Sequence, residues 1–97
     1  MSRPRFWWYE NIVRIIKAFP ALAVRDDLTE AEDRAREAVA SALDVCTDEE
    51  KEVIRLNVWK GLTLEQTAAA VFTSERTAQS RRIAFVYRVA REYGYIS

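Results

Sequence analysis

Apolar residues recur at spacings of three and four along most of the chain, which places their side chains on one face of an α-helix. Stretches of this kind predict helices over residues 5–19, 30–45, 48–60, a short segment that begins at 64, and 75–92. Pro20 follows the first stretch, and because proline disrupts a continuing helix, we expect that helix to end near Phe19. The chain has only two glycines and two prolines, so the many tight turns of a β fold are not expected. The pattern therefore predicts an all-α fold, a small helical bundle of about five helices.

Polar residues before the predicted helices mark where they begin. A capping box, in which each side chain accepts a hydrogen bond from the other residue's free backbone N–H, is predicted at 29–32, 47–50 and 63–66. Ser74 is expected to cap the last helix. Gly61 and Gly94 stand where a left-handed C-terminal residue is expected, so they are predicted to end the helices before them.

The last two predicted helices are separated by a short turn. We expect Ala68 to lie where the two helices pass close together, and Val71 and Phe72 to fill the corner between them. The residues of the last helix predicted to be buried are Ala78, Ile83, Phe85, Val86, Val89 and Ala90. The bundle is therefore expected to end in a helix-turn-helix, with residues 75–92 as the recognition helix.

The residue types present limit the chemistry that the chain can perform. There is no histidine, which removes the commonest general base, the commonest metal ligand and every Ser-His or Cys-His nucleophile. Cys46 is the only cysteine, so neither an internal disulfide nor a Cys-rich zinc site is possible. The spacing of the acidic residues singles out no catalytic pair. We therefore expect no enzyme activity, no cofactor and no metal site.

The length of 97 residues fits one compact domain. Within it, residues 1–46 are expected to form an N-terminal helical pair and residues 47–97 the helix-turn-helix part. The N-terminal segment lacks the continuous apolar run and the small-residue cleavage site of a signal peptide. No apolar stretch approaches the roughly 20 residues that span a bilayer. We expect a soluble, cytoplasmic protein that does not bind membranes.

Charge is distributed unevenly along the chain, although the formal net charge is zero. Residues 1–19 carry a net charge of +3, residues 25–50 carry −7, and residues 74–97 carry +3. Local charge, more than the sum, decides whether a surface attracts nucleic acid. The basic last segment therefore remains a candidate for contact with phosphate.

The exposed side of the last predicted helix combines side chains that bind DNA. In the major groove, arginine bonds guanine and glutamine bonds adenine through two hydrogen bonds each, and a recognition helix presents its N-terminal turns to that groove. The candidate DNA-binding residues are Thr63, Ser74, Arg76, Thr77, Gln79, Ser80, Arg81 and Arg82. We expect Arg76 and Gln79 to read bases, and Arg81 and Arg82 to supply much of the affinity for double-stranded DNA.

Residues 48–92 resemble region four of sigma factors and related phage regulators. The shared pattern is an acidic start to an apolar helix, then Gly-Leu-Thr-x-Glu-x-x-Ala from Gly61, then Ser-x-x-Thr from Ser74 and a basic helix. Residues 5–20 are similar to the opening of small phage-encoded regulators of the ArpU and RinA type. The resemblance implies a sequence-specific transcriptional regulator, a phage or prophage late-gene activator, with host RNA polymerase as a possible partner.

The chain departs from the sigma-like pattern at the turn. Thr67 stands where isoleucine is usual, Ala78 replaces valine, and Phe72 and Thr73 replace a glycine followed by isoleucine or valine. The missing glycine implies an altered angle between the two helices. The segment with which a complete sigma factor opens the promoter is also missing, so the resemblance implies a stand-alone regulator.

Four consecutive aromatic residues near the N-terminus, Phe6, Trp7, Trp8 and Tyr9, offer more area than packing against three short helices requires. Tryptophan is enriched in interface hot spots, and helix-turn-helix proteins that read symmetric sites usually dimerise. We therefore expect part of residues 5–19 to form a homodimer or polymerase-facing surface centred on Trp7 or Trp8. The alternative is that both indoles are buried against the alanine-rich second helix.

Three other interpretations fit the same pattern. An ordinary five-helix bundle also shows capped amphipathic segments, with solvated arginines on its last helix. A phage small terminase subunit also carries a helix-turn-helix but serves DNA packaging. A protein-binding module, such as an anti-sigma factor or an adaptor that grips RNA polymerase, would dock through the acidic residues 25–50. Binding to random DNA across salt concentrations separates these, because phosphate contacts weaken steeply with salt.

Overall fold

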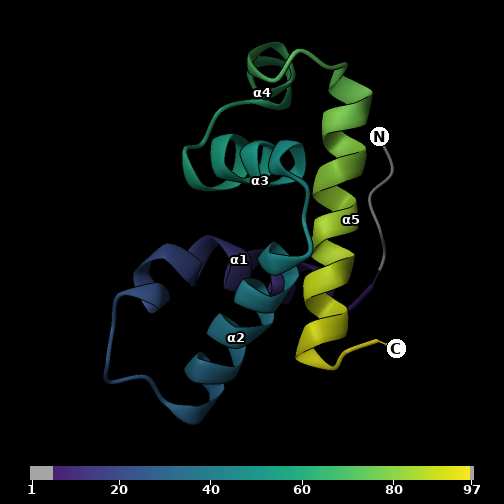
Figure 1. The fold of residues 1–97 in the computed structure, drawn as a ribbon. Helices are drawn as coiled ribbons and strands as arrows, with labels where there is room; N and C mark the ends of the chain where they lie inside the picture. Colours follow the sequence, from purple (N-terminus) through teal and green to yellow (C-terminus); the bar gives the residue numbers. More distant parts are fainter. Residues whose placement is uncertain (1–5, 97) are drawn as a thin grey trace.

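The helices after the first begin close to the predicted capping signals. The computed structural model describes residues 6–96, and within this range every regular element is a helix (Figure 1). In chain order the elements are α1 (Tyr9–Ala23), α2 (Glu30–Asp44), α3 (Asp48–Ile54), the π-helical turn η1 (Arg55–Trp59), α4 (Leu64–Ala70) and α5 (Glu75–Tyr93). The predicted all-α bundle is therefore confirmed. Within residues 6–96, no helix has both the length and the apolar composition needed to cross a membrane.

The predicted caps are present at α2, α3, α4 and α5. In the first three, the N-cap threonine accepts a hydrogen bond from the backbone N–H three residues later, and its own N–H donates to the Glu or Gln side chain there. Ser74 accepts a hydrogen bond from the backbone N–H of Thr77 at 3.0 Å and begins α5. Gly94 ends α5 with a φ of 98°, and Gly61 follows η1 with a φ of 83°. Glycine adopts this left-handed conformation without a steric cost, so both predicted helix ends are confirmed.

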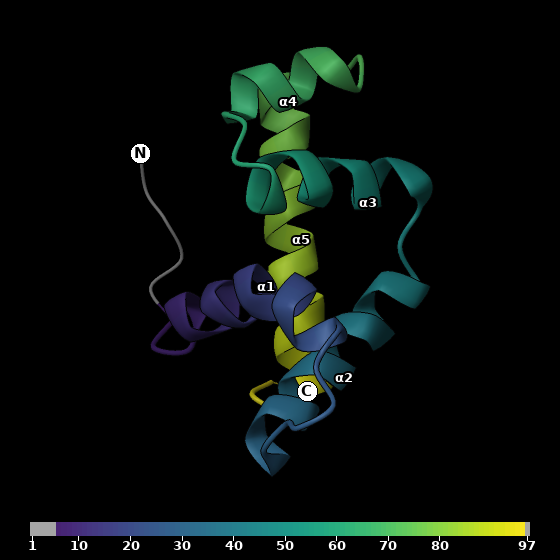
Figure 2. The ribbon, with the colours of Figure 1, turned by 90° about the vertical axis from the view of Figure 1, so that its left-hand side faces the viewer.

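Helix α5 is the axis on which the other helices pack. Helices α3 and α4 lie against its N-terminal half, and α1 and α2 lie against its C-terminal half (Figures 1 and 2). The main core draws buried side chains from α1, α2, α3 and α5, among them Ile12, Ile16, Val39, Ile54, Phe85 and Val89. Ala38 and Ala42 of α2 are buried in the same core, and their small side chains allow α2 to come close to α5. One core therefore joins both halves of the chain.

The prediction that the first helix ends near Phe19 is wrong, because α1 continues through Pro20 to Ala23. Proline has no N–H, so the carbonyl of Ile16, four residues earlier, loses its usual helical donor. The indole Nε1 of Trp59 donates to that carbonyl instead, at 2.7 Å. The Trp59 ring also stacks on Phe19, with 5.9 Å between the ring centroids. A donor from a segment far along the chain thus replaces the missing backbone bond, and the helix continues.

Trp59 lies in a π-helical turn within the segment predicted as one helix over 48–60. The backbone N–H of Lys60 donates to the carbonyl of Arg55, five residues earlier, at 2.9 Å. Such turns are rare and widen the helix locally. After this turn, the side-chain amide of Asn57 donates to the carbonyl of Leu62 at 2.8 Å and holds the chain that leads to α4. The π-helical turn therefore has two contacts that position its neighbours. Trp59 packs against α1, and Asn57 holds the segment that leads to α4.

Candidate nucleic-acid interface

Three helices meet at the N-terminal half of α5. Val53 of α3, Ala68 of α4 and Ala78 of α5 form a small buried cluster, against which Leu64 and Val71 pack. Alanine at two of these positions lets the helix backbones approach closely, as expected from the sequence. The cluster holds α3 and α4 on the Ala78 side of α5 (Figure 2). The opposite side of this half of α5 therefore lies outside this buried cluster.

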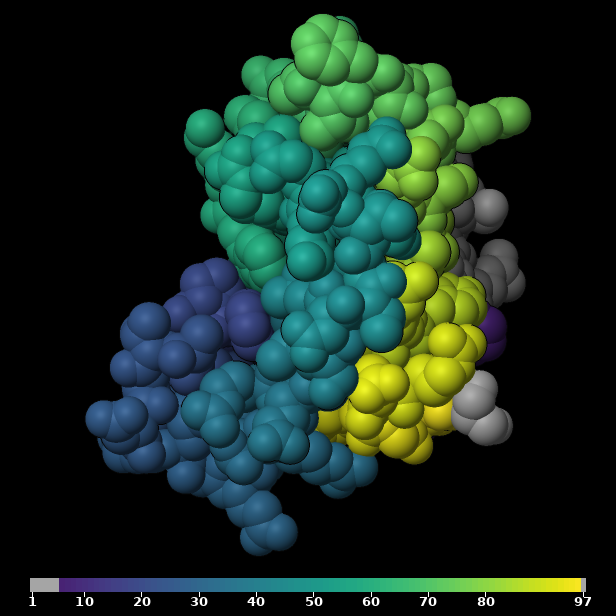
Figure 3. All heavy atoms as spheres, viewed as in Figure 1, coloured from purple at the N-terminus to yellow at the C-terminus, as the bar shows by residue number. Residues whose placement is uncertain are grey.

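The connection between α4 and α5 forms one tip of the molecule (Figures 1 and 3). Val71 packs in the corner between the helices as predicted, but the expectation that Phe72 fills it too is wrong. Phe72 has a φ of 58°, in the left-handed region, and its side chain is 96% exposed. The backbone N–H of Thr73 donates to the carbonyl of Ala68 at 3.0 Å. The chain therefore reverses tightly through Phe72, and this reversal leaves the ring in solvent.

The side of α5 opposite Ala78 presents polar side chains. Arg76 and Ser80, which lie one helical turn apart, are exposed, and Thr77 and Gln79 beside them are half-buried. We call Arg76, Thr77, Gln79 and Ser80 the outward face of α5. These four predicted residues therefore lie together on the surface of one half-helix.

The other predicted hydroxyl groups take part in helix capping. The Ser74 hydroxyl donates to Oγ1 of Thr77 at 2.8 Å, while it accepts the backbone N–H of that same residue. Thr63 Oγ1 accepts the backbone N–H of Gln66 at 3.0 Å. Both capping residues are exposed, so each still offers a lone pair at the surface. Their first role, however, is to begin α4 and α5.

Arg81 and Arg82 do not lie together on the outward face. Nη2 of Arg81 is 3.1 Å from a carboxylate oxygen of Glu49 on α3. Arg82 is half-buried, and its charge partly offsets the rise that burial causes in the pKa of Tyr9. Its Nε is buried and has no hydrogen-bond partner among residues 6–96. Consecutive helical residues point about 100° apart, so the two side chains reach different surroundings.

A groove runs between the start of α3 and the outward face of α5. It is lined by Glu50, Arg76, Thr77, Ser80, Arg81 and Ala84. The backbone N–H of Thr47 donates a hydrogen bond to the carboxylate of Glu50 and holds the pKa of Glu50 below its ordinary value. The positive charge of Arg88, whose Nη1 lies 3.6 Å from the same carboxylate, also lowers this pKa. Sequence reasoning did not place Glu49 or Glu50 at this site. The sequence showed only that residues 25–50 are acidic. It could not show that Glu49 and Glu50 lie beside α5, because that contact depends on how α3 packs.

The aromatic residues predicted as a partner surface divide into two pairs. Trp8 and Tyr9 are buried, with Trp8 only 3% exposed, so the expectation that they lie on a surface is wrong. Trp8 packs edge-on against Tyr87 of α5, with 5.5 Å between the ring centroids. Phe6 and Trp7 are exposed, and Trp7 is 79% exposed. Of the four, Phe6 and Trp7 are therefore the pair open to a partner.

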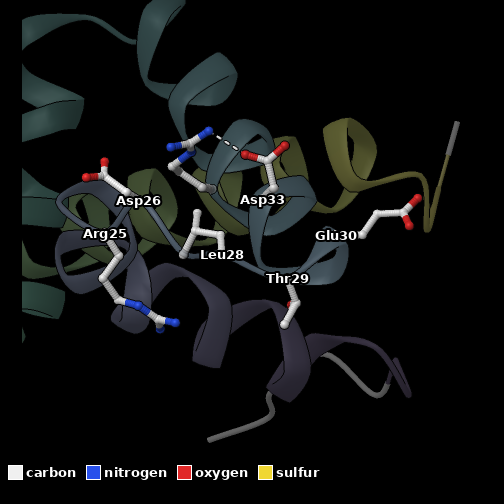
Figure 4. Close-up of a pocket in the computed structure, with 7 residues that line it drawn as sticks. Arg25, Asp26, Leu28, Thr29, Glu30 and Asp33 are labelled. Atoms are coloured by element: carbon white, nitrogen blue, oxygen red, sulfur yellow. Dashed lines mark hydrogen bonds and ion pairs between the residues drawn. The ribbon is translucent and has the colours of Figure 1, made fainter.

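A separate polar pocket lies at the connection between α1 and α2, at the end of the molecule away from α4 (Figures 1 and 4). It is lined by Arg25, Asp26, Leu28, Thr29, Glu30, Asp33 and Arg36. Arg25 is paired with Glu32 at 3.1 Å, and Arg36 is paired with Asp33. A charged ligand in this pocket would compete with existing ion pairs. This pocket is therefore a weaker candidate for a binding site than the groove beside α5.

Comparison of the chain with protein-family models, with curated proteins and with solved structures finds no match. The candidate site is therefore judged by its own chemistry. The outward face of α5 offers the guanidinium of Arg76 and the hydroxyl of Ser80 on an exposed helix. A guanidinium binds either phosphate or the edge of guanine, and a hydroxyl binds phosphate or base edges. This combination is suited to nucleic acid.

Proposed function

We propose that the protein binds double-stranded DNA by placing the N-terminal half of α5 in the major groove, and that it regulates transcription. The observation that carries the proposal is the two-sided character of this half-helix. Ala78 is completely buried towards α3 and α4, whereas Arg76 and Ser80 are exposed on the other side. The major groove admits an α-helix that presents one polar side in this way.

The side chains of the outward face fit the chemistry of that groove. Arg76 would donate two hydrogen bonds to O6 and N7 of guanine, which is the commonest base-specific contact in such complexes. Gln79 at the edge of the face would bind adenine, and Ser80 would bind a base edge or a phosphate. The half-helix thus combines groups that read bases with a group that positions the protein.

The surrounding charges indicate which contacts matter most. Glu75 in the first turn of α5 and Glu49 beside the groove repel phosphate, and Arg81 already offsets the charge of Glu49. Arg76 has no carboxylate within ion-pair distance among residues 6–96. We therefore expect Arg76 to contribute more to DNA affinity than Arg81. The sequence alone had led us to expect the larger contribution from Arg81 and Arg82.

The regulatory part of the proposal is supported by the resemblance of residues 48–92 to region four of sigma factors. A regulator of this kind acts on a promoter together with RNA polymerase. The exposed rings of Phe6 and Trp7 lie outside the outward face and are the candidate contact for host polymerase or for a second copy of the chain. In this interpretation the protein is an activator of phage or prophage late genes.

Titration of a labelled pool of random DNA duplexes, followed by fluorescence anisotropy at several salt concentrations, tests the proposal. The logarithm of the binding constant should fall linearly with the logarithm of salt concentration, because bound phosphates release counterions. Arg76→Ala should weaken binding to a duplex that the wild type selects from this pool more than binding to the pool itself if Arg76 contacts a base. If the contact is to phosphate, both should weaken and the salt slope should fall by about one. Arg14→Ala, which removes an exposed arginine of α1, is the matched control and should change binding less. Absence of binding by the wild type, or binding that ignores salt, would overturn the proposal.

A further inference from the structure

Phe72 occupies its place at the tip between α4 and α5 against two physical preferences. A large aromatic ring gains free energy when it leaves water, yet this one is 96% exposed. A side chain with a β-carbon is disfavoured at positive φ, yet Phe72 has a φ of 58°. Glycine would satisfy both preferences at this position.

The fold does not use the Phe72 ring. The neighbouring Val71 packs against the cluster of Val53, Ala68 and Ala78, and Phe72 is not part of that cluster. The tight reversal is held by backbone bonds, from Thr73 to Ala68 and from Phe72 itself to Ala69 at 3.3 Å. A residue that is costly to the fold and contributes no packing is a candidate for function.

The position of Phe72 relates it to the outward face of α5. It stands two residues before Ser74, the N-cap of α5, and four residues before Arg76. Four residues span at most about 14 Å even when fully extended, and here they form a turn and the start of a helix. A duplex that contacts Arg76 therefore comes within reach of a ring at the tip.

We propose that Phe72 packs against apolar surface of the bound duplex, either thymine C5-methyl groups or deoxyribose carbons, beside the bases contacted by α5. This inference rests on the proposed function. Apolar side chains, phenylalanine among them, contact the thymine methyl in the major groove, and the contact gives sequence preference without a hydrogen bond. Burial of the ring against DNA would recover the free energy that its exposure costs in the free protein.

The test measures folding and binding on the same variants. Phe72→Gly removes the ring and suits positive φ, so its thermal unfolding midpoint should equal or exceed that of the wild type. Its affinity for a duplex selected by the wild type from a random pool should fall about tenfold, the loss expected when an apolar ring no longer buries at an interface. The salt slope should stay the same, because no phosphate contact is lost. Phe72→Asn, which also tolerates this backbone conformation, should behave alike.

Two controls separate this inference from the proposed function. Val24→Ala truncates another exposed apolar side chain, at the end of α1, and should leave DNA affinity unchanged. Replacement of each thymine of the selected duplex by deoxyuridine removes one methyl group at a time. If a thymine methyl is the contact, one replacement weakens wild-type binding but not that of Phe72→Gly. If the deoxyribose is the contact, no deoxyuridine replacement weakens wild-type binding, and Phe72→Gly still binds the selected duplex more weakly than the wild type does.

The outcomes are distinct. Wild-type binding to DNA with unchanged affinity of Phe72→Gly overturns this inference alone and leaves the proposed function in place. A lower unfolding midpoint for both Phe72→Gly and Phe72→Asn also overturns it, because the ring would then serve the fold. No binding of the wild type to DNA overturns both proposals.

Discussion

The guanidinium of Arg81 lies 3.1 Å from the carboxylate of Glu49 and ties the second turn of α5 to the first turn of α3. Both side chains are partly exposed, at 33% and 40%, so the pair contributes little to the stability of the fold. Its larger effect is electrostatic, because it places one negative charge beside the outward face of α5 and engages one of the arginines available to DNA.

Substitution of Glu49 should therefore strengthen DNA binding. Glu49→Gln removes the negative charge and releases Arg81, so affinity for random duplex DNA should rise, and the salt slope should increase by up to about one. Glu52→Gln is the matched control, since Glu52 of α3 is paired with Arg55 of η1. Anisotropy titrations over a salt series measure both quantities. Equal affinities for Glu49→Gln and Glu52→Gln would show that the Arg81 pair has no influence on binding.

A second prediction concerns the bond between Trp59 and the carbonyl of Ile16. Trp59→Phe removes the donor and leaves a buried acceptor unpaired, which should destabilise the fold by about 1–3 kcal/mol. In a Pro20→Ala background the backbone regains an N–H at position 20, so the same substitution should cost less. Urea unfolding of the wild type, both single variants and the double variant measures the coupling. Additive free energies would mean that the indole does not replace the missing backbone donor.

The capping box of α3 predicts a specific dependence of stability on pH. The N–H of Thr47 holds the pKa of Glu50 below its ordinary value of 4.5. A carboxyl with a lowered pKa in the folded state stabilises the fold above the unfolded pKa, and this contribution is lost as pH falls through the folded pKa. Glu50→Gln keeps the box, as Gln66 does in α4, but carries no charge. Its unfolding midpoint should lie below that of the wild type at neutral pH and converge with it in acid. Curves that stay parallel down to pH 3 would contradict this assignment.

The two neighbouring tryptophans should respond differently to truncation. Trp8→Ala creates a cavity in the main core and should cost about 3–5 kcal/mol, a large part of the stability of so small a domain. Trp7→Ala affects an exposed ring, so its unfolding free energy should change by about 0.5 kcal/mol or less. If Trp7 contributes to a homodimer, the same variant should also lower the mass measured by sedimentation. Unfolding costs of similar size would contradict the assigned burial.

Helix starts could be predicted from sequence because they depend on nearby residues. Each threonine cap needs only the side chain three residues later, and the glycines at 61 and 94 need only their own backbone freedom. The same local logic failed at Pro20. The donor that compensates for its missing N–H comes from Trp59, which approaches α1 only after the chain has folded.

Two features of the candidate site, the exposure of Phe72 and the partner of Arg81, depend on the folded structure and could not be predicted from spacing or charge. Apolar spacing placed Phe72 in the corner, but the left-handed backbone at this residue directs its ring outward. Basic character made Arg81 a candidate for DNA, but the position of Glu49 on a separately packed helix gives it a partner within the protein. Arg76 and Ser80 could be chosen from the sequence because their exposure follows from helical periodicity relative to Ala78.

The indole of Trp59 and the carbonyl of Ile16 belong to the two segments, residues 1–46 and 47–97, that the sequence suggested as separate parts. The carbonyl of Ile16 in α1 obtains its hydrogen-bond donor only when η1 packs against α1, and residues 60–63 connect η1 to α4. We therefore expect the two segments to fold and unfold as one cooperative unit, with no stable intermediate in which residues 47–97 alone are structured. A fragment cut after residue 46 would expose the apolar face shared with α5 and leave the proline-containing turn of α1 frayed. In the proposed complex, the angle at which α5 meets DNA would then depend on the whole chain, including α1, which packs against the C-terminal half of α5.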